Sequence, residues 1–377
     1  MVQPDLLARA HALLPRMVDA VGSLVRAESP SEDLAACEDV VRKAADDFDQ
    51  WGLGAARMEH HAGRPTWRWG PPRPRALLLG HLDTVWPSGT LDSLPFTVEH
   101  DRMRGPGVFD MKAGVVQGWA ALLLAGIDEG SGVGMLLTTD EETGSLHSRD
   151  LVLDACAEAD AVLVLEPSVD GALKSARKGT SWYEVCLAGR AAHAGLDPAN
   201  GINAVSAAAE LVLACPGWSD DPRGTTVTPT VLHGGTTSNT VPADAVLTID
   251  VRAWTTGEQH RVDAALRAWS PVLTTAAVAV DGGINRPAME AAMSASLLAE
   301  ARAVHEHLGL GPLADRPVGG ASDGNFTAAA GIPTLDGLGA VGDGAHAAHE
   351  WASIPAMADR AALLAALIGR VLRGPSA

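Results

Sequence analysis

Short apolar runs recur in the first half of the chain, and polar residues follow each of them. The runs are Ala76–Leu79, Val133–Leu137 and Ala161–Leu165. Wholly apolar runs of this length are typical of strands buried on both faces of a parallel sheet. The segments at about 112–127 and 145–158 have the apolar spacing of helices. Strands that alternate with helices form βαβ units, so the sequence predicts an α/β fold with a mostly parallel sheet flanked by helices.

The pattern changes at Thr180, where apolar and polar residues begin to alternate. The stretches SWYEVCLAG, TTVTPTVLHGG and AVLTIDVRAW read as antiparallel strands, and helices are expected at about 200–215 and 257–270. These elements predict a smaller α+β domain over 180–284. It interrupts a discontinuous main domain of 1–179 and 285–377.

Further helices are expected at 5–26 and 31–50, at about 287–308 and at about 353–373. Ser29-Pro30-Ser31 supplies the break and a helix cap between the first two. The weak alternation over 51–75 predicts strands at a sheet edge.

Length and composition indicate a globular protein of two domains. The chain has 377 residues, of which 47% are hydrophobic and 20% charged, enough for a sizeable core and a charged surface. No apolar run approaches the roughly 20 residues of a membrane span, and the N-terminus reads as an amphipathic helix rather than a signal peptide. We therefore expect no membrane association and a cytoplasmic location.

The net charge of −18 argues against nucleic acid as a partner. The four cysteines are scattered and form no CxxC pair, so neither a disulfide framework nor a cysteine-type zinc site is expected.

Acidic residues and a histidine stand where the predicted strands end. They are His81, Glu141, Glu142 and Glu166. An isolated pair of glutamates is most simply a solvated acidic turn. Ligands of parallel sheets, however, bind at the carboxyl ends of the strands. One histidine and several carboxylates, without cysteine, suit a pair of divalent ions such as Zn²⁺, with Co²⁺ or Mn²⁺ as alternatives.

Two aspartates fit the same interpretation. Asp83 lies two residues after His81, on the same side of an extended chain, and could accept a hydrogen bond from the ring nitrogen that does not face a metal. Taken alone, it could instead be a capping residue beside an exposed histidine. Asp110 precedes an apolar helix, where it could be an N-cap or could project between two cations.

Eight stretches occur in an order that resembles a known family. They are GHLDTV, GPGVFDMKAG, TTDEETGS, LEPS, RKGTSWYEV, GRAAHAGLDPANGINA, TTSNTVPADAVLTIDVRAW and GAHAAHEW. Together they resemble the co-catalytic zinc peptidases and amidohydrolases that include bacterial glutamate carboxypeptidase, aminoacylase, acetylornithine deacetylase and succinyl-diaminopimelate desuccinylase.

The resemblance implies two zinc ions per subunit. His81 and Glu166 would hold one metal, Glu142 and His346 the other. Asp110 would bridge the two, with a possible cis peptide bond to the next residue.

The resemblance also assigns roles away from the ligands. Glu141 would be the general base and acid, and Asp83 would orient the histidine ligand. The inserted domain would be a lid through which the chain forms a homodimer. In that domain His193 would reach the partner's active site and stabilise the oxyanion, while Asn239 and Arg252 would engage a substrate carboxylate.

Two departures from the family pattern leave alternatives open. The last motif reads His346-Ala347-Ala348-His349-Glu350, so His349 is a rival ligand to His346. One of Lys174, Arg177 and Lys178 could meet an acidic substrate side chain. Arg177 is our candidate, and ordinary surface charge is the alternative.

These features predict a two-metal hydrolase that cleaves an amide bond next to a free carboxylate. The favoured interpretation is a glutamate-carboxypeptidase-like enzyme that acts on small peptides, and an N-acyl-amino-acid deacylase is the alternative. A non-catalytic metal-dependent binding protein on the same fold is a third possibility, but it would have no use for a base at Glu141.

Overall fold

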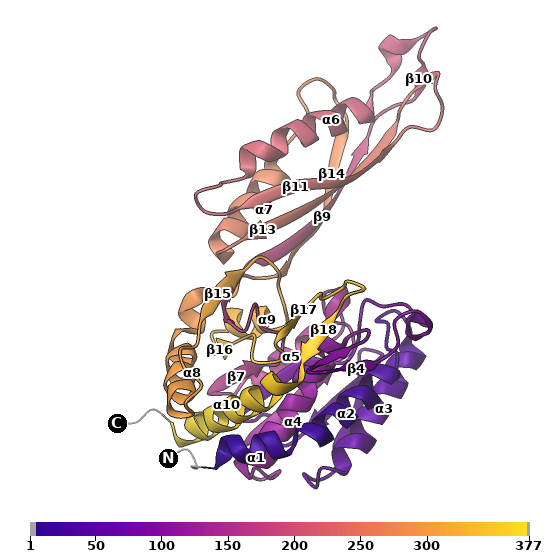
Figure 1. The fold of residues 1–377 in the computed structure, drawn as a ribbon. Helices are drawn as coiled ribbons and strands as arrows, with labels where there is room; N and C mark the ends of the chain where they lie inside the picture. The colour runs from indigo at the N-terminus through magenta and orange to yellow at the C-terminus, as the bar shows by residue number, and fades with distance from the viewer. Residues whose placement is uncertain (1–4, 375–377) are drawn as a thin grey trace. The chain divides into compact units, whose positions relative to one another are not determined.

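The computed structural model describes residues 5–374, which form two compact units. The large unit comprises the residues up to Ala176, Ala291–Val318 and the residues from Ser322 onward. The small unit comprises Arg177–Glu290 and Gly319–Ala321. Figure 1 shows an α/β unit interrupted by a smaller α+β unit, which confirms the predicted fold class.

A six-stranded sheet forms the centre of the large unit. Its order is β1 (Arg57–His61), β2 (Arg64–Trp69), β6 (Val133–Thr138), β3 (Ala76–His81), β7 (Ala161–Val164) and β16 (Thr334–Leu335). The last four are parallel to one another, whereas β1 and β2 pair antiparallel. Of the two strands within 51–75, β1 lies at an edge of the sheet, whereas β2 lies between β1 and β6. The expectation of edge strands throughout 51–75 was therefore wrong for β2, whose residues are all buried.

Both faces of this sheet are covered by helices. In β3, Leu78 packs into one apolar cluster, while Leu77 and Leu79 pack into another. The first cluster contains residues of α1 (Leu6–Ala12), α2 (Leu14–Arg26), α3 (Leu34–Asp49), α4 (Ala113–Ala125), α8 (Ala295–His307) and α10 (Ile354–Arg373). The second contains residues of α5 (Arg149–Cys156), which contacts α9 (Gly324–Ala329). Burial on both faces explains the uninterrupted apolar runs.

Several helix boundaries differ from expectation; α8, for example, begins at Ala295 rather than near residue 287. The first predicted helix divides into α1 and α2, and α2 has a proline in its first turn, a position where the missing N–H costs little. The second helix, α3, begins later than predicted. Asp33 caps it by accepting hydrogen bonds from the amides of Ala35 and Ala36, so Ser31 is not the cap.

One helical stretch in the described part of the chain, Val108–Ala125, has the length and apolar composition of a membrane span. It is 83% buried inside the protein and includes α4, so a core position accounts for its composition.

A second, four-stranded sheet in the large unit joins distant parts of the chain. Its order is β17 (Gly342–Asp343), β18 (Trp351–Ser353), β5 (Arg102–Arg104) and β4 (Thr97–Glu99). In this sheet Trp351 pairs with Arg104. The residues just after β5 and the residues just before β18 therefore lie at the same end of this strand pair.

The small unit is an antiparallel sheet with two helices. The strand order is β11 (Thr226–Gly234), β13 (Asp244–Ala253), β9 (Gly179–Ala188) and β14 (Ala277–Arg286). Alternate residues of these strands form one core with α6 (Ala204–Ala214) and α7 (Thr256–Ala268). A separate two-stranded ribbon pairs β10 (Ala192–His193) with β12 (Thr240–Val241). Strands β8 (Leu173–Arg177) and β15 (Asp315–Val318), which belong to the large unit except for Arg177, form a further two-stranded sheet.

Candidate metal centre

The carboxyl ends of three parallel strands bring the first group of polar residues together. His81 is the last residue of β3 and aligns with Thr138 at the end of β6. Glu141 follows β6 in a one-turn helix, and Glu166 follows β7. Because the three strands are neighbours and run the same way, residues that follow them meet at one edge.

His81 is almost completely buried and its two ring nitrogens have different surroundings. Nδ1 lies 3.0 Å from the backbone oxygen of Asp83 and 3.4 Å from Oδ1 of the same residue. Nε2 faces Asp110 Oδ1 at 3.4 Å and Glu166 Oε1 at 3.6 Å. Within the described part of the chain, neither His81 Nε2 nor Asp110 Oδ1 has a hydrogen-bond partner. Buried polar atoms are nearly always satisfied by a protein group, an ordered water or an ion, so this pair of atoms is a candidate position for a bound cation.

Asp83 joins this histidine to the turn that carries the two glutamates. Its carboxylate accepts hydrogen bonds from Ser31 Oγ at 2.7 Å, from the amide of Glu142 at 3.2 Å and from that of Glu141 at 3.4 Å. Asp83 is fully buried. One carboxylate therefore holds both the His81 ring and the backbone of the Glu141–Glu142 turn.

A second cluster lies on the other side of Asp110. His346 Nε2 is 3.1 Å from Glu142 Oε2 and 3.5 Å from Asp110 Oδ2. The two carboxylate oxygens of Asp110 thus face two different histidines, His81 through Oδ1 and His346 through Oδ2. The peptide bond from Asp110 to Met111 is cis. Asp110 caps no helix, because α4 begins three residues later without a side-chain cap.

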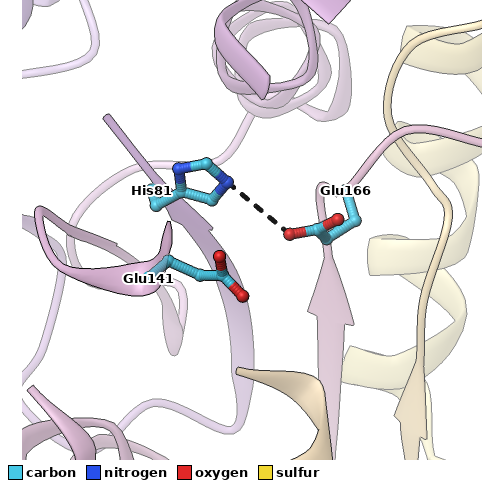
Figure 2. Close-up of side chains that lie close together, drawn as sticks. All are labelled: His81, Glu141 and Glu166. Atoms are coloured by element: carbon cyan, nitrogen blue, oxygen red, sulfur yellow. Dashed lines mark ion pairs between the residues drawn. The ribbon is translucent and has the colours of Figure 1, made fainter. Parts of the chain in front are cut away.

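Glu141 belongs to the first cluster by position. Ligand-type atoms of His81, Glu141 and Glu166 all lie within 4.8 Å of one another. Figure 2 shows the three side chains converging, with the ion pair between His81 and Glu166 as a dashed line. Glu166 also pairs with Lys174, whose Nζ is 3.5 Å from Oε2.

The pKa values show how strongly these carboxylates require positive charge. Burial alone would lower the pKa of His81, but the surrounding carboxylates, Asp110 first among them, raise it well above its usual value. Hydrogen bonds to Asp110 and Glu142 raise the pKa of His346 to about 10. Burial raises the pKa of Glu142 to about 7. Although Asp110 is buried, the two histidines beside it hold its pKa below the usual value.

The donor set fits two divalent cations. In both His81 and His346, Nε2 faces Asp110 and one glutamate. Imidazole and carboxylate are ligands of zinc and related metals. The partnerless His81 Nε2 and Asp110 Oδ1 face each other at 3.4 Å, where a cation would bind both. The raised pKa values of His81 and His346 reflect the negative charge of the surrounding carboxylates, which bound cations would offset.

The rival histidine lies outside this arrangement. Among the described residues His346 contacts both Asp110 and Glu142, whereas His349 forms no ion pair and its backbone oxygen accepts a hydrogen bond from Arg104. The geometry therefore favours His346 over His349.

Two of the predicted lid residues meet within the small unit. His193 of β10 pairs with Thr240 of β12, and the amide of Ala194 donates to the backbone oxygen of Asn239 at 2.8 Å. The amides of Gly195 and Leu196 donate to His193 Nδ1 at 3.1 and 3.0 Å. Because Nδ1 is an acceptor, Nε2 of the neutral ring carries the proton.

The two candidate arginines have internal partners. Arg252 pairs with Asp250 on the same strand, through Nε at 2.8 Å and Nη2 at 2.9 Å. Arg177 is buried and donates to the backbone oxygens of Gly320 and Ala321, both at 3.2 Å. These contacts favour a structural role for Arg177, and its contact with substrate stays a prediction.

Sequence reasoning missed two buried residues that support the site, Ser31 and Glu350. Ser31 stood out only as a helix cap, although it donates to Asp83. Glu350 ends the motif that begins with His346, and that proximity was the signal that could have identified it.

Comparison with known proteins agrees with this geometry. The sequence profile described as "Peptidase family M20/M25/M40" matches residues 77–370. Carboxypeptidase G2 of Pseudomonas sp. (strain RS-16) is 33% identical over 304 residues, which cover 78% of this chain and 72% of that protein. Acetylornithine deacetylase of Aliivibrio fischeri (strain MJ11) is 30% identical over 198 residues, covering 47% of this chain and 50% of that protein.

A solved structure shares the fold over nearly the whole chain. Aminopeptidase PepT of Bacillus cereus ATCC 10987 superposes with a TM-score of 0.76 at 20% identity, covering 95% of this chain and 98% of that one. The profile spans well over half of the sequence, including every proposed metal ligand. The chain therefore belongs to peptidase family M20/M25/M40 and is a metal-binding hydrolase.

Proposed function

We propose that this protein is a dinuclear zinc hydrolase that cleaves an amide bond beside a free carboxylate and releases a C-terminal, glutamate-like amino acid. The observation that supports this most is Asp110, whose two oxygens face two histidines, each with a glutamate nearby. Similarity to carboxypeptidase G2 over 78% of the chain supports the substrate class. Co²⁺ and Mn²⁺ are alternatives to Zn²⁺ for the same ligands.

Bound cations would polarise the scissile carbonyl and make hydroxide available near neutral pH. The residues of the chain do the rest. Asp83 fixes the His81 ring so that Nε2 faces the site. Glu141 is buried at the same edge of the sheet. Its carboxylate accepts a proton from the attacking water and returns that proton to the departing amine.

The small unit would supply the remaining contacts. His193, with its proton on Nε2, is prepared to donate a hydrogen bond to the developing oxyanion. Arg252 has the two-pronged geometry that binds a carboxylate, as its pairing with Asp250 illustrates, and Asn239 lies beside His193 in the same ribbon. We further propose that the enzyme is a cytoplasmic homodimer joined through this unit, with each His193 serving the partner's active site.

A second candidate function is hydrolysis of N-acyl amino acids. It is favoured by the similarity to acetylornithine deacetylase, and the same metal centre would perform it. The two functions differ in the acyl group and in the amino acid that the enzyme accepts, so a substrate panel separates them.

The test is a panel of N-acyl and peptidyl glutamates, N-acetylornithine and N-succinyl-diaminopimelate on zinc-reconstituted protein. Each glutamate substrate is paired with its α-carboxamide as the matched control. We expect glutamate release from the free acids and at least about a tenfold lower kcat/KM for the amides, because a hydrogen bond to a charged group contributes about 1.5–3 kcal/mol. Preference for N-acetylornithine would establish the deacylase instead. Equal rates on acid and amide would refute carboxylate recognition.

A further inference from the structure

The carboxylate of Glu350 is buried and receives four N–H donors. Oε1 accepts from the amides of Phe109 at 2.8 Å and Asp110 at 3.1 Å. Oε2 accepts from the amide of Gly107 at 2.9 Å and the indole Nε1 of Trp86 at 3.0 Å. The residue is 1% exposed. Three of the four donors belong to residues 107–110, called here the Asp110 segment.

A carboxylate is the side chain that this set of donors requires. An ionised carboxylate only accepts hydrogen bonds, whereas the amide of glutamine would present two N–H groups to a pocket that contains donors. Burial raises the pKa of Glu350, and the backbone hydrogen bonds act in the opposite direction. A buried acid is costly unless it is satisfied, and these four contacts satisfy it.

Glu350 also lies at the end of the turn that presents His346. The amide of Ala347 donates to the oxygen of Gly344, and the amide of Glu350 donates to the oxygen of Ala347, both at 2.9 Å. Gly344 has φ +83°, and a Cβ there would lie 3.0 Å from the Glu350 backbone, so the turn is tight. The backbone of Glu350 is thus part of the turn over residues 344–350 that presents His346, while its side chain binds the Asp110 segment.

We propose that Glu350 is a positioning residue that locks the Asp110 segment to the His346 turn, so that both oxygens of Asp110 face their two histidines. It is not a ligand, because both of its oxygens already accept hydrogen bonds from N–H groups. The inference rests on the ligand set of the proposed function. It adds that one buried acid, outside that set, controls the affinity of both metal positions together.

The experiment compares Glu350→Gln with wild type and with His349→Ala, which alters the neighbouring side chain of the same turn but none of these four contacts. Zn²⁺ affinity of each position is measured by chelator competition below the unfolding transition, and the visible spectrum of the Co²⁺-loaded protein reports ligand geometry. We expect Glu350→Gln to weaken both positions about 10–100-fold and to change the spectrum. His349→Ala should do neither.

A lower Tm with unchanged affinity and spectrum would overturn the proposal, because that result describes a merely structural residue. If Glu350→Gln does not fold, Trp86→Phe decides. That variant removes one of the four donors and leaves the acid in place. A several-fold loss of affinity at both positions supports the proposal and unchanged affinity overturns it. Wild-type protein that fails to bind two ions would instead refute the ligand set itself.

Discussion

Replacing Glu141 with glutamine distinguishes two roles that its position allows. One of its carboxylate oxygens lies within 4.8 Å of ligand atoms of both His81 and Glu166. Donor atoms bound to one zinc at about 2.0–2.2 Å are at most about 4.4 Å apart, so this distance accommodates either a ligand or a base one water molecule away. Glu141→Gln keeps the size and one oxygen of the side chain but removes its basicity.

If Glu141 is the base, the variant should retain two ions and lose about 10²–10⁴ in kcat, the usual contribution of general acid–base catalysis. This loss corresponds to about 3–5 kcal/mol in the barrier. Metal analysis and single-turnover hydrolysis measure the two effects separately. Glu158→Gln, at an exposed glutamate on the surface, is the matched control and should change neither.

Two outcomes would contradict the assignment of Glu141 as the base. If Glu141→Gln loses an ion, the residue is a ligand and the base must be sought elsewhere. Two ions together with full turnover would remove Glu141 from the mechanism altogether.

Three further predictions follow from the same site. Asp110→Ala should weaken both metal positions at once in a zinc titration, because a bridging carboxylate offsets repulsion between the cations, and normal binding of two ions would refute the bridge. With metal removed, the free energy of unfolding should fall as pH rises from 6.5 to 10 on account of His346, and from 4.5 to 7 on account of Glu142, since the pKa of each is raised in the folded state; zinc should abolish this slope in denaturant titrations. Mixing His193→Ala with Glu141→Gln subunits should restore about a quarter of wild-type activity if the histidine acts across a dimer, and nothing if it acts within its own chain.

The strands and their ends could be predicted from the sequence because the signal is local. The apolar runs gave β3, β6 and β7 almost residue by residue, since strands buried on both faces need apolar side chains at every position. Parallel pairing then required that His81, Glu141 and Glu166 meet at one edge.

The supporting residues could not be predicted because their partners are distant in sequence. Ser31 donates to a carboxylate 52 residues away, and Glu350 accepts from an amide 241 residues away. No local pattern encodes either contact. The Glu350 contact depends on the pairing of β5 with β18, and the Ser31 contact depends on the loop before α3 meeting the residues that follow β3. The partner of Arg252 is closer, two residues away on the same strand, but only the side-chain geometry shows that Asp250 pairs with its guanidinium, at 2.8 Å.

Counting bound metal ions against activity tests directly whether hydrolysis depends on a dinuclear centre. Metal-free protein is titrated with Zn²⁺ while N-acylglutamate hydrolysis and bound metal are measured in the same samples. We expect binding to saturate at two ions per chain and full activity to require both, because Asp110 presents one oxygen to each histidine. Saturation at a single ion with full hydrolysis, or hydrolysis that persists in folded metal-free protein, would contradict this expectation.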